Sequence, residues 1–259
     1  MMRVLVAISV FATLVVNGLA NTLPINGQTT GDISDRFQVY FTPAGYVFAI
    51  WGLIYLGLVA FAVYQALPSQ QENPRLGRSR GWLALSGAAN IVWLLLWHYE
   101  RFPLTMVAML ALLGLLILTY VGLEIGRVPV ARAERWLVQV PISLYLGWIS
   151  VATIANASVV LTDLGWSGWG ISPQSWTLVM IAAALAIGWA MAIRRGDLAF
   201  SLVLVWAFAG IAIRNSGVSV VAGGAWVAAA VALLAAAVAI WSFSRSRAQS
   251  ALRSGPRAP

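Results

Sequence analysis

Long runs of apolar residues, separated by short polar stretches, dominate the chain. The clearest run extends from Pro43 to Ala66, 24 residues without a formal charge. A helix of that length is about 36 Å long, which is enough to cross ~30 Å of hydrocarbon with some tilt. Thr42 is expected to cap this helix, and Pro43 suits its first turn because the missing N–H costs nothing there. The segment is therefore predicted to span a membrane.

The same pattern predicts eight spans. The first, residues 4–20, follows Arg3 and is either a cleaved signal peptide or a retained helix; we expect it to be retained. The polar connection over residues 21–41 is long enough to fold over a helix bundle. Further spans are predicted at about 82–97, 104–123, 136–161, 176–193, 198–213 and 218–243, and residues 244–259 are expected to form a disordered basic tail. The predicted fold class is an all-α polytopic transmembrane helix bundle.

Composition and charge agree with a membrane location. The chain is 61% hydrophobic and 9% charged, which is too apolar for an ordinary soluble core. Its net charge of +8 comes from sixteen arginines and no lysine. With the N-terminus inside, thirteen arginines fall on the inner side and only Arg36, Arg101 and Arg214 outside. This split predicts cytoplasmic N- and C-termini in the cell membrane, and it explains the charge without a nucleic-acid partner.

Several chemistries are excluded by missing residue types. Without lysine there is no Schiff base, and without cysteine there is no disulfide, thiolate nucleophile or iron–sulfur cluster. The one histidine, His98, cannot provide paired-histidine ligation of haem or zinc within one chain, and it is expected in a solvated turn with Glu100 and Arg101. No ionisable residue lies at the middle of a predicted span, so charge translocation is disfavoured. We expect no enzyme activity, catalytic residue, metal site or cofactor.

Three predicted helices each carry aromatic or amide side chains on one face. The spacing places these residues together at intervals of three, four or seven. The three sets are Phe48, Trp51 and Tyr55; Ser86, Asn90, Trp93 and Trp97; and Tyr145, Trp148, Ala152 and Asn156. We expect the three faces to meet around one apolar cavity edged by two amides.

Each of these side chains also has a purely structural interpretation. Tryptophans inside a span either form a ligand wall or pack in the core, and Asn90 and Asn156 either orient a ligand or form interhelical hydrogen bonds. Tryptophans near predicted helix ends are typical of interfacial belts. That assignment covers Trp82, Trp97, Trp136, Trp166, Trp169, Trp176 and Trp241.

The chain resembles the TspO/MBR family of tryptophan-rich sensory proteins, which includes the mitochondrial translocator protein, or peripheral-type benzodiazepine receptor. The resemblance covers residues 1–161 and is carried by Thr42, Pro43, Gly45, Phe48, Trp51, Asn90, Trp93, Tyr145, Trp148, Ala152 and Asn156. It implies a five-helix core over residues 1–161, whereas residues 162–243 carry no resemblance and are expected to form a three-helix extension. It also implies a lipophilic pocket under the first loop for porphyrins, sterols or synthetic aromatic ligands, often in a dimer.

Three departures from the family pattern affect the expected ligand. The usual Ser-Trp-Thr-Pro-Pro is replaced by Tyr40 to Ala44, which loses the tryptophan, with Phe41 in its place, and one proline. The proline that normally precedes the tyrosine of the fifth helix is replaced by Leu144, with Pro141 three residues earlier. Porphyrin chemistry is weakened by these changes, whereas a shape-selective apolar pocket survives. The expected ligand-binding residues are Phe41, Pro43, Phe48, Trp51, Tyr55, Asn90, Trp93, Tyr145, Trp148, Ala152 and Asn156.

The leading functional hypothesis is a membrane protein that binds a flat or bulky apolar molecule, such as a tetrapyrrole or a sterol-like lipid, for sensing or transport. The alternative is a permease for a small apolar solute, in which the three additional helices complete the path. Expected partners are membrane lipids, the lipophilic ligand, with porphyrin as one possibility, and a second copy of the chain in a homodimer.

Overall fold

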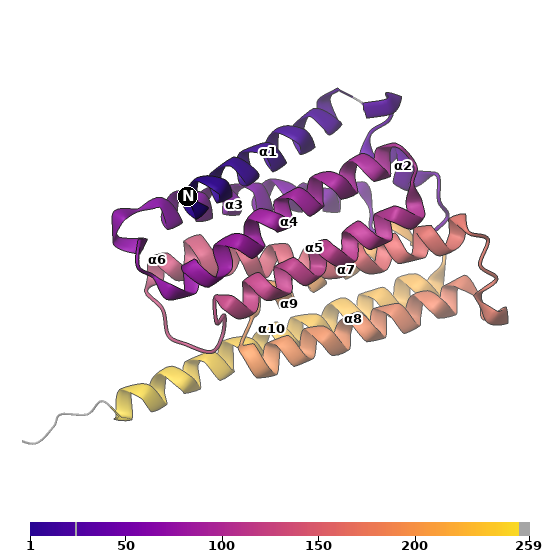
Figure 1. Ribbon diagram of the computed structural model, residues 1–259. Helices are drawn as coiled ribbons and strands as arrows, with labels where there is room; N and C mark the ends of the chain where they lie inside the picture. The colour runs from indigo at the N-terminus through magenta and orange to yellow at the C-terminus, as the bar shows by residue number, and fades with distance from the viewer. Residues whose placement is uncertain (24, 254–259) are drawn as a thin grey trace, which may run out of the picture.

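The computed structural model describes residues 1–23 and 25–253, with side chains as far as Ile240 (Figure 1). Every regular element in these ranges is helical, which confirms the predicted all-α bundle. The long helices are α1 (Met2–Thr22), α3 (Ile50–Ala66), α4 (Pro74–His98), α5 (Phe102–Gly122), α7 (Val140–Asp163), α8 (Pro173–Arg195), α9 (Leu198–Arg214) and α10 (Ser219–Arg253). Short elements are η1 (Ile25–Gly27), α2 (Thr30–Asp35), η2 (Gly45–Ala49), η3 (Pro68–Gln70), α6 (Arg132–Glu134), η4 (Arg135–Gln139) and η5 (Gly168–Gly170).

The described helices include seven that are long and apolar enough to cross a membrane. The remaining predicted span is α9, an apolar helix of 17 residues. At 1.5 Å per residue it is about 25 Å long, at the lower limit for a span. More than half of its residues are buried, because α9 lies between α7 on one side and α8 and α10 on the other.

The helices run side by side in one bundle, with α1 at one edge and α8 and α10 at the other (Figure 1). α1 packs on α3 and α4, α4 on α5, α5 on α7, and α7 on α9. A single cluster of buried apolar side chains reaches from Val6 in α1 to Ala232 in α10. The proposed domain boundary after residue 161 stays a prediction.

Helix α1 is fixed to α4 by polar contacts inside the bundle. The Ser9 hydroxyl donates to the Ala84 carbonyl at 2.7 Å, and the Asn17 amide donates to Asn90 Oδ1 at 2.8 Å. The helices approach closely at Gly87, where an added Cβ would overlap two hydroxyl side chains of α1. Small and polar residues therefore hold α1 in place, as is typical of helix packing in lipid.

Two predicted boundaries differ from the structure because a helix signal lay outside the apolar run. α4 begins at Pro74 and not at Trp82, since the Asn73 side chain caps the backbone of Arg75 and Leu76 and proline suits the first turn. Three arginines predicted in a loop therefore lie on α4. At the other end of the chain, α10 continues to Arg253. Only residues 254–259 of the predicted tail lie outside the described residues.

The predicted cap of the second span is wrong. Thr42 makes no cap: it is buried in a bend, and helical structure begins only at Gly45 with η2. The Ala44 N–H donates to the Gly210 carbonyl of α9 at 3.1 Å, so a tertiary hydrogen bond takes a donor that a Thr42 cap would have bonded. Pro43 therefore lies in the non-helical segment before η2, packed inside the bundle, and not in the first turn of a helix.

The fifth predicted span, 136–161, is part of a longer helical stretch over residues 132–163 with a π-helical turn at η4. Pro141 lies two residues after the end of this turn. A proline lacks the N–H of the normal ladder, and its ring conflicts with the carbonyl four residues earlier, which favours a widened turn. Gly57 of α3 faces the proline ring and leaves room for it.

Candidate ligand pocket

A small apolar cavity lies under the first connection, where α2, the Thr42–Pro43 segment, α3, α4, α5 and α7 meet. Its volume is about 70 Å³. No lining residue carries a formal charge. The described lining consists of Thr30, Ser34, Thr42, Pro43, Phe48, Trp51, Trp93, Trp97, Met109, Trp148, Ile149, Val151, Ala152, Ala155, Asn156 and Val159.

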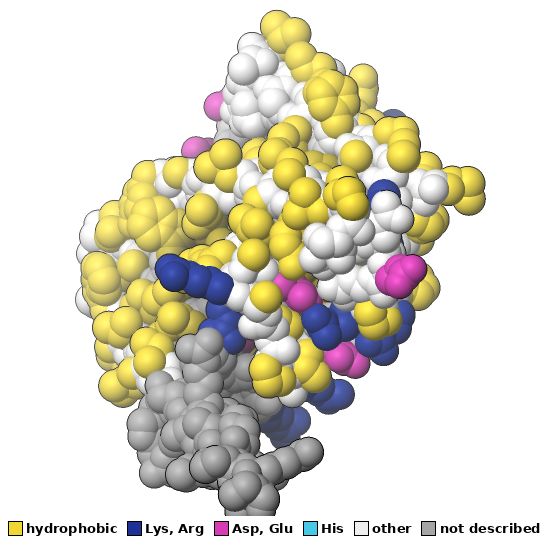
Figure 2. Space-filling view, turned by 90° about the vertical axis from the view of Figure 1, so that its left-hand side faces the viewer, with side chains coloured by type: hydrophobic (Ala, Val, Ile, Leu, Met, Phe, Trp, Pro, Cys, Tyr) yellow, Lys and Arg dark blue, Asp and Glu magenta, His cyan; other side chains and the backbone are white. Residues whose placement is uncertain are grey.

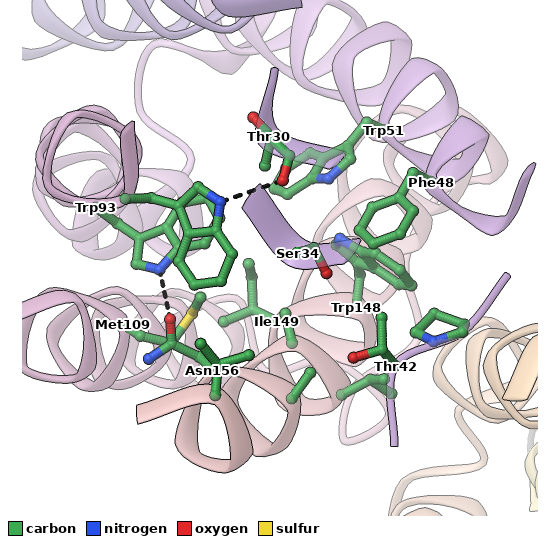
Figure 3. Close-up of a pocket in the computed structure, with 16 residues that line it drawn as sticks. Thr30, Ser34, Thr42, Phe48, Trp51, Trp93, Met109, Trp148, Ile149 and Asn156 are labelled. Carbon is green, nitrogen blue, oxygen red and sulfur yellow. Dashed lines mark hydrogen bonds between the residues drawn. The ribbon is translucent and has the colours of Figure 1, made fainter. Parts of the chain in front are cut away.

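One wall of the cavity is aromatic. The Trp148 ring lies edge-on to Phe48, with centroids 5.7 Å apart, and edge-on to Trp51 at 6.4 Å. Figure 3 shows these three rings gathered on one side of the cavity. Edge-to-face contacts at these distances are favourable ring geometries. The wall therefore presents both ring faces and ring edges to the cavity.

The opposite wall combines stacked indoles with an amide (Figure 3). Trp93 and Trp97 stack with centroids 5.6 Å apart. The Trp93 N–H donates to Asn156 Oδ1 at 3.0 Å, and the Thr105 hydroxyl donates to the same oxygen at 3.1 Å. Asn156 of α7 thus joins α4 and α5, while its own amide nitrogen reaches only the Met106 sulfur at 3.6 Å.

The indole N–H of Trp148 has no hydrogen-bond partner among the described residues, although the side chain is 3% exposed. Leaving a buried donor without an acceptor costs ~1–3 kcal/mol. Trp148 lines the cavity, where a ligand with a hydrogen-bond acceptor could satisfy this N–H. This N–H is the most direct indication that the cavity accepts a ligand.

The first connection covers the cavity, as its length predicted. Thr29 and Asp32 form a capping box that starts α2, and the two hydrogen bonds from Thr29 lower the pKa of Asp32. The Trp97 indole donates to the Thr30 carbonyl at 3.2 Å, so α2 rests on the pocket wall. An ion pair between Arg214 and Asp35, 2.7 Å long, ties α2 to α9.

A second ion pair closes the cover over the turn between α4 and α5. Arg36 and Glu100 lie 3.0 Å apart, and Gln28 donates to the same carboxylate at 3.1 Å. These contacts, from Gln28 first and then from Arg36, lower the pKa of Glu100. Both charged groups are substantially exposed, so the pair is expected to be weak and easily opened.

The structure brings together seven of the eleven residues that the sequence proposed. Pro43, Phe48, Trp51, Trp93, Trp148, Ala152 and Asn156 line the cavity. The other four lie outside the lining: Tyr55 stacks on Trp51, Tyr145 packs edge-on to Trp51, Asn90 bonds to Asn17, and Phe41 is fully buried in the core. For Asn90 the structure favours the interhelical hydrogen bond over contact with the cavity.

Two sequence assignments are corrected here. Trp97 was placed in an interfacial belt, but it is 4% exposed and lines the cavity. His98 was expected in solvent, but it is fully buried, with Nδ1 2.9 Å from the Leu94 carbonyl. In both cases the cover formed by α2 takes the end of α4 out of water. By contrast, Trp136 and Trp169 are well exposed.

Thr30 and Ser34 are lining residues that sequence reasoning missed. The signal was present, because Thr29 followed three residues later by Asp32 is the start pattern of a short helix. A helix there would have placed Thr30 and Ser34 on one face. Their contact with the cavity, however, depends on how the connection folds back.

The lining of the pocket carries no carboxylate, imidazole or guanidinium side chain. Among the described residues, no group of three or more His, Cys, Asp or Glu side chains could hold a metal ion. The cavity wall has apolar and aromatic surface, four indoles, one amide and three hydroxyl side chains. Such a lining recognises ligands by shape, ring contact and one or two hydrogen bonds.

Fold and site together define a multi-pass membrane helix bundle with an internal aromatic pocket. The profile of the family described as TSPO-like protein matches residues 3–239, and the chain belongs to this family. The match extends beyond residue 161 and so includes α8, α9 and most of α10. No curated protein and no solved structure gives a significant match.

Proposed function

We propose that this protein binds a planar, lipophilic molecule in the pocket between α3, α4 and α7, as a TspO-type sensory or translocator protein. The observation that carries the proposal is the buried, unpartnered Trp148 N–H in an uncharged aromatic cavity. Ring contacts and apolar burial would supply affinity, and the indole N–H would select a ligand with an acceptor atom. The role is binding, without catalysis or a resident cofactor.

The size of the cavity limits what can enter without movement. At about 70 Å³ it is smaller than the ~150 Å³ of an engineered cavity that accepts benzene. A tetrapyrrole or sterol would have to displace the cover, and α2 is the part held by exposed ion pairs. We therefore propose that larger ligands enter by displacing α2, with Thr30 and Ser34 moving off the pocket.

The first test is quenching of tryptophan fluorescence by protoporphyrin IX in purified protein. Trp148→Leu should weaken binding by at least ten-fold, because it removes a ring that contacts both Phe48 and Trp51. Trp226→Leu is the matched control, since Trp226 is an exposed side chain of α10. Equal affinities for the two variants would refute the pocket as the binding site.

A second test isolates the indole N–H with quinoline and naphthalene, two ligands of the same shape of which only quinoline has a ring nitrogen acceptor. The native protein should prefer quinoline, and Trp148→Phe should remove that preference. The coupling expected is ~0.5–1.5 kcal/mol, roughly a two- to twelve-fold effect. A preference that persists in Trp148→Phe would show that the N–H does not bind the ligand.

We further propose that the end of the bundle bearing α6 and the N-terminus faces the cytoplasm of a cell membrane. Nine arginines with described side chains lie at that end, whereas Arg36, Arg101 and Arg214 lie at the other. Figure 2 shows several of the nine on the surface of this end. Such an asymmetry sets orientation during insertion. Labelling with a membrane-impermeant thiol reagent would test it: Arg127→Cys should react only from the cytoplasm, and reaction from the outside would refute this orientation.

A further inference from the structure

An apolar groove runs between α1 and α3 on the outer surface of the bundle. Its volume is about 520 Å³, and its walls include Ala7, Phe11 and Leu14 of α1 with Val59, Val63 and Leu67 of α3. Phe11 is 70% exposed and Val63 is 61% exposed, so the groove opens outward to the membrane. From Val59 to Leu67 it is about 12 Å long, roughly the inner part of one acyl chain.

Two arginines, Arg3 and Arg80, lie beyond one end of the groove without lining it. Gln65 joins them through one amide: its Nε2 donates to the Arg3 carbonyl at 3.0 Å, and its Oε1 accepts from Arg80 Nε at 3.0 Å. Arg80 is 7% exposed and donates further to the Gln70 carbonyl at 3.0 Å. A guanidinium is thus held at the end of α3 by neutral acceptors alone.

Neither arginine is neutralised within the described part of the chain. Arg3 and Arg80 form no ion pair there, and Glu72, in the connection between α3 and α4, also forms none. The neighbouring arginines of α4 do have acidic partners: Arg75 lies 2.9 Å from Glu134, and Arg78 lies 3.1 Å from Glu124. Two cations without an acidic partner among the described residues therefore lie near one end of the apolar groove.

We propose that this groove binds one anionic phospholipid, with its headgroup phosphate between Arg3 and Arg80 and an acyl chain along α1 and α3. An anionic phospholipid fits because the exposed apolar groove lies next to two arginines that have no acidic partner among the described residues. Arginine binds phosphate through several donors at once, and a cation near the surface attracts anionic lipid. A second copy of the chain would cover the apolar channel but would leave the two charges unpaired.

Native mass spectrometry of the full chain tests the headgroup contact, comparing retention of phosphatidylglycerol and phosphatidylcholine with identical acyl chains. The native protein should retain phosphatidylglycerol preferentially. Arg3→Gln should reduce that preference by about five-fold, the factor that corresponds to ~1 kcal/mol per arginine near an anionic surface. Arg3 is suited to the test because its side chain makes no hydrogen bond or ion pair with a described residue. Arg127→Gln, in the connection between α5 and α6, is the control and should change nothing.

The apolar half of the proposal is tested by filling the groove. Val63→Trp should abolish preferential retention, whereas Val227→Trp, at a similarly exposed position of α10, should not. Equal retention of both lipids by the native protein would overturn the proposal. Equal effects of Arg3→Gln and Arg127→Gln on lipid retention would also overturn it. Displacement of the lipid by millimolar inorganic phosphate would indicate a site for free anions and would overturn it as well. Loss of a dimer in Val63→Trp, with lipid retention unchanged, would assign the groove to a second copy and also overturn it.

Discussion

Replacing Asp197 with alanine should destabilise the bundle more than any surface substitution, because this carboxylate connects three helices. Its Oδ2 accepts from the Tyr120 hydroxyl of α5 at 2.8 Å and from the Ser143 hydroxyl of α7 at 2.6 Å. Its Oδ1 caps α9 by accepting from the Phe200 N–H at 3.0 Å. The residue is 6% exposed, so water cannot replace these contacts easily.

The magnitude follows from the groups left behind. Loss of the cap costs ~1 kcal/mol, and each of two buried hydroxyl donors left without an acceptor costs ~1–3 kcal/mol. Removal of a buried carboxylate relieves several kcal/mol of desolvation, which offsets part of this sum. We expect the free energy of unfolding to fall by ~2–3 kcal/mol, which corresponds to a fall in Tm of about 4–12 °C for a chain of this size.

The assay is thermal unfolding followed by intrinsic tryptophan fluorescence in one detergent. Asp163→Ala is the matched control, since Asp163 is exposed at the end of α7. Tyr120→Phe and Ser143→Ala should each lower the free energy of unfolding by ~1 kcal/mol, because each removes a hydroxyl that donates to Asp197. In a protein that already carries Asp197→Ala, each substitution should have a smaller effect. A Tm for Asp197→Ala within about 1 °C of Asp163→Ala would refute the reasoning.

Three further outcomes are expected. Burial raises the pKa of Asp197, so the folded protein holds the carboxyl proton to a higher pH than the unfolded chain does. The Tm of the native protein should therefore fall, relative to that of Asp197→Asn, as the pH rises from about 4 through the folded-state pKa of Asp197. Gly87→Ala should lower the free energy of unfolding by ~1–3 kcal/mol, because the added methyl group would push α1 away from α4. Gly77→Ala lies on the same helix with open space around it and should raise the free energy of unfolding by up to ~1 kcal/mol. Thermal unfolding of both variants checks this. Gly210→Ala should lower Tm and also weaken the quenching of tryptophan fluorescence by the ligand, because the added Cβ would overlap Val47 and displace the segment that carries Pro43 to the pocket wall. Quenching equal to that of the native protein would contradict this.

The sequence by itself determined where the spans lie and which residues share a face. Lipid satisfies no backbone hydrogen bond, so a long apolar run must be helical, and helical spacing then puts Trp93 with Trp97 and Trp148 with Asn156. Short-range signals also marked elements that hydropathy missed. Asn73 before a proline starts α4 early, and Thr29 with Asp32 starts α2.

Only the tertiary structure decided which faces meet and what each shared atom bonds to. Nothing local shows that Asn156 Oδ1 accepts from Trp93, or that Asp197 accepts from hydroxyls on α5 and α7. Ala44 stays outside the helix because its N–H bonds to the Gly210 carbonyl of α9, more than 160 residues away. Contacts of this kind depend on the three-dimensional position of distant helices, and the periodicity of one helix carries no information about its neighbour.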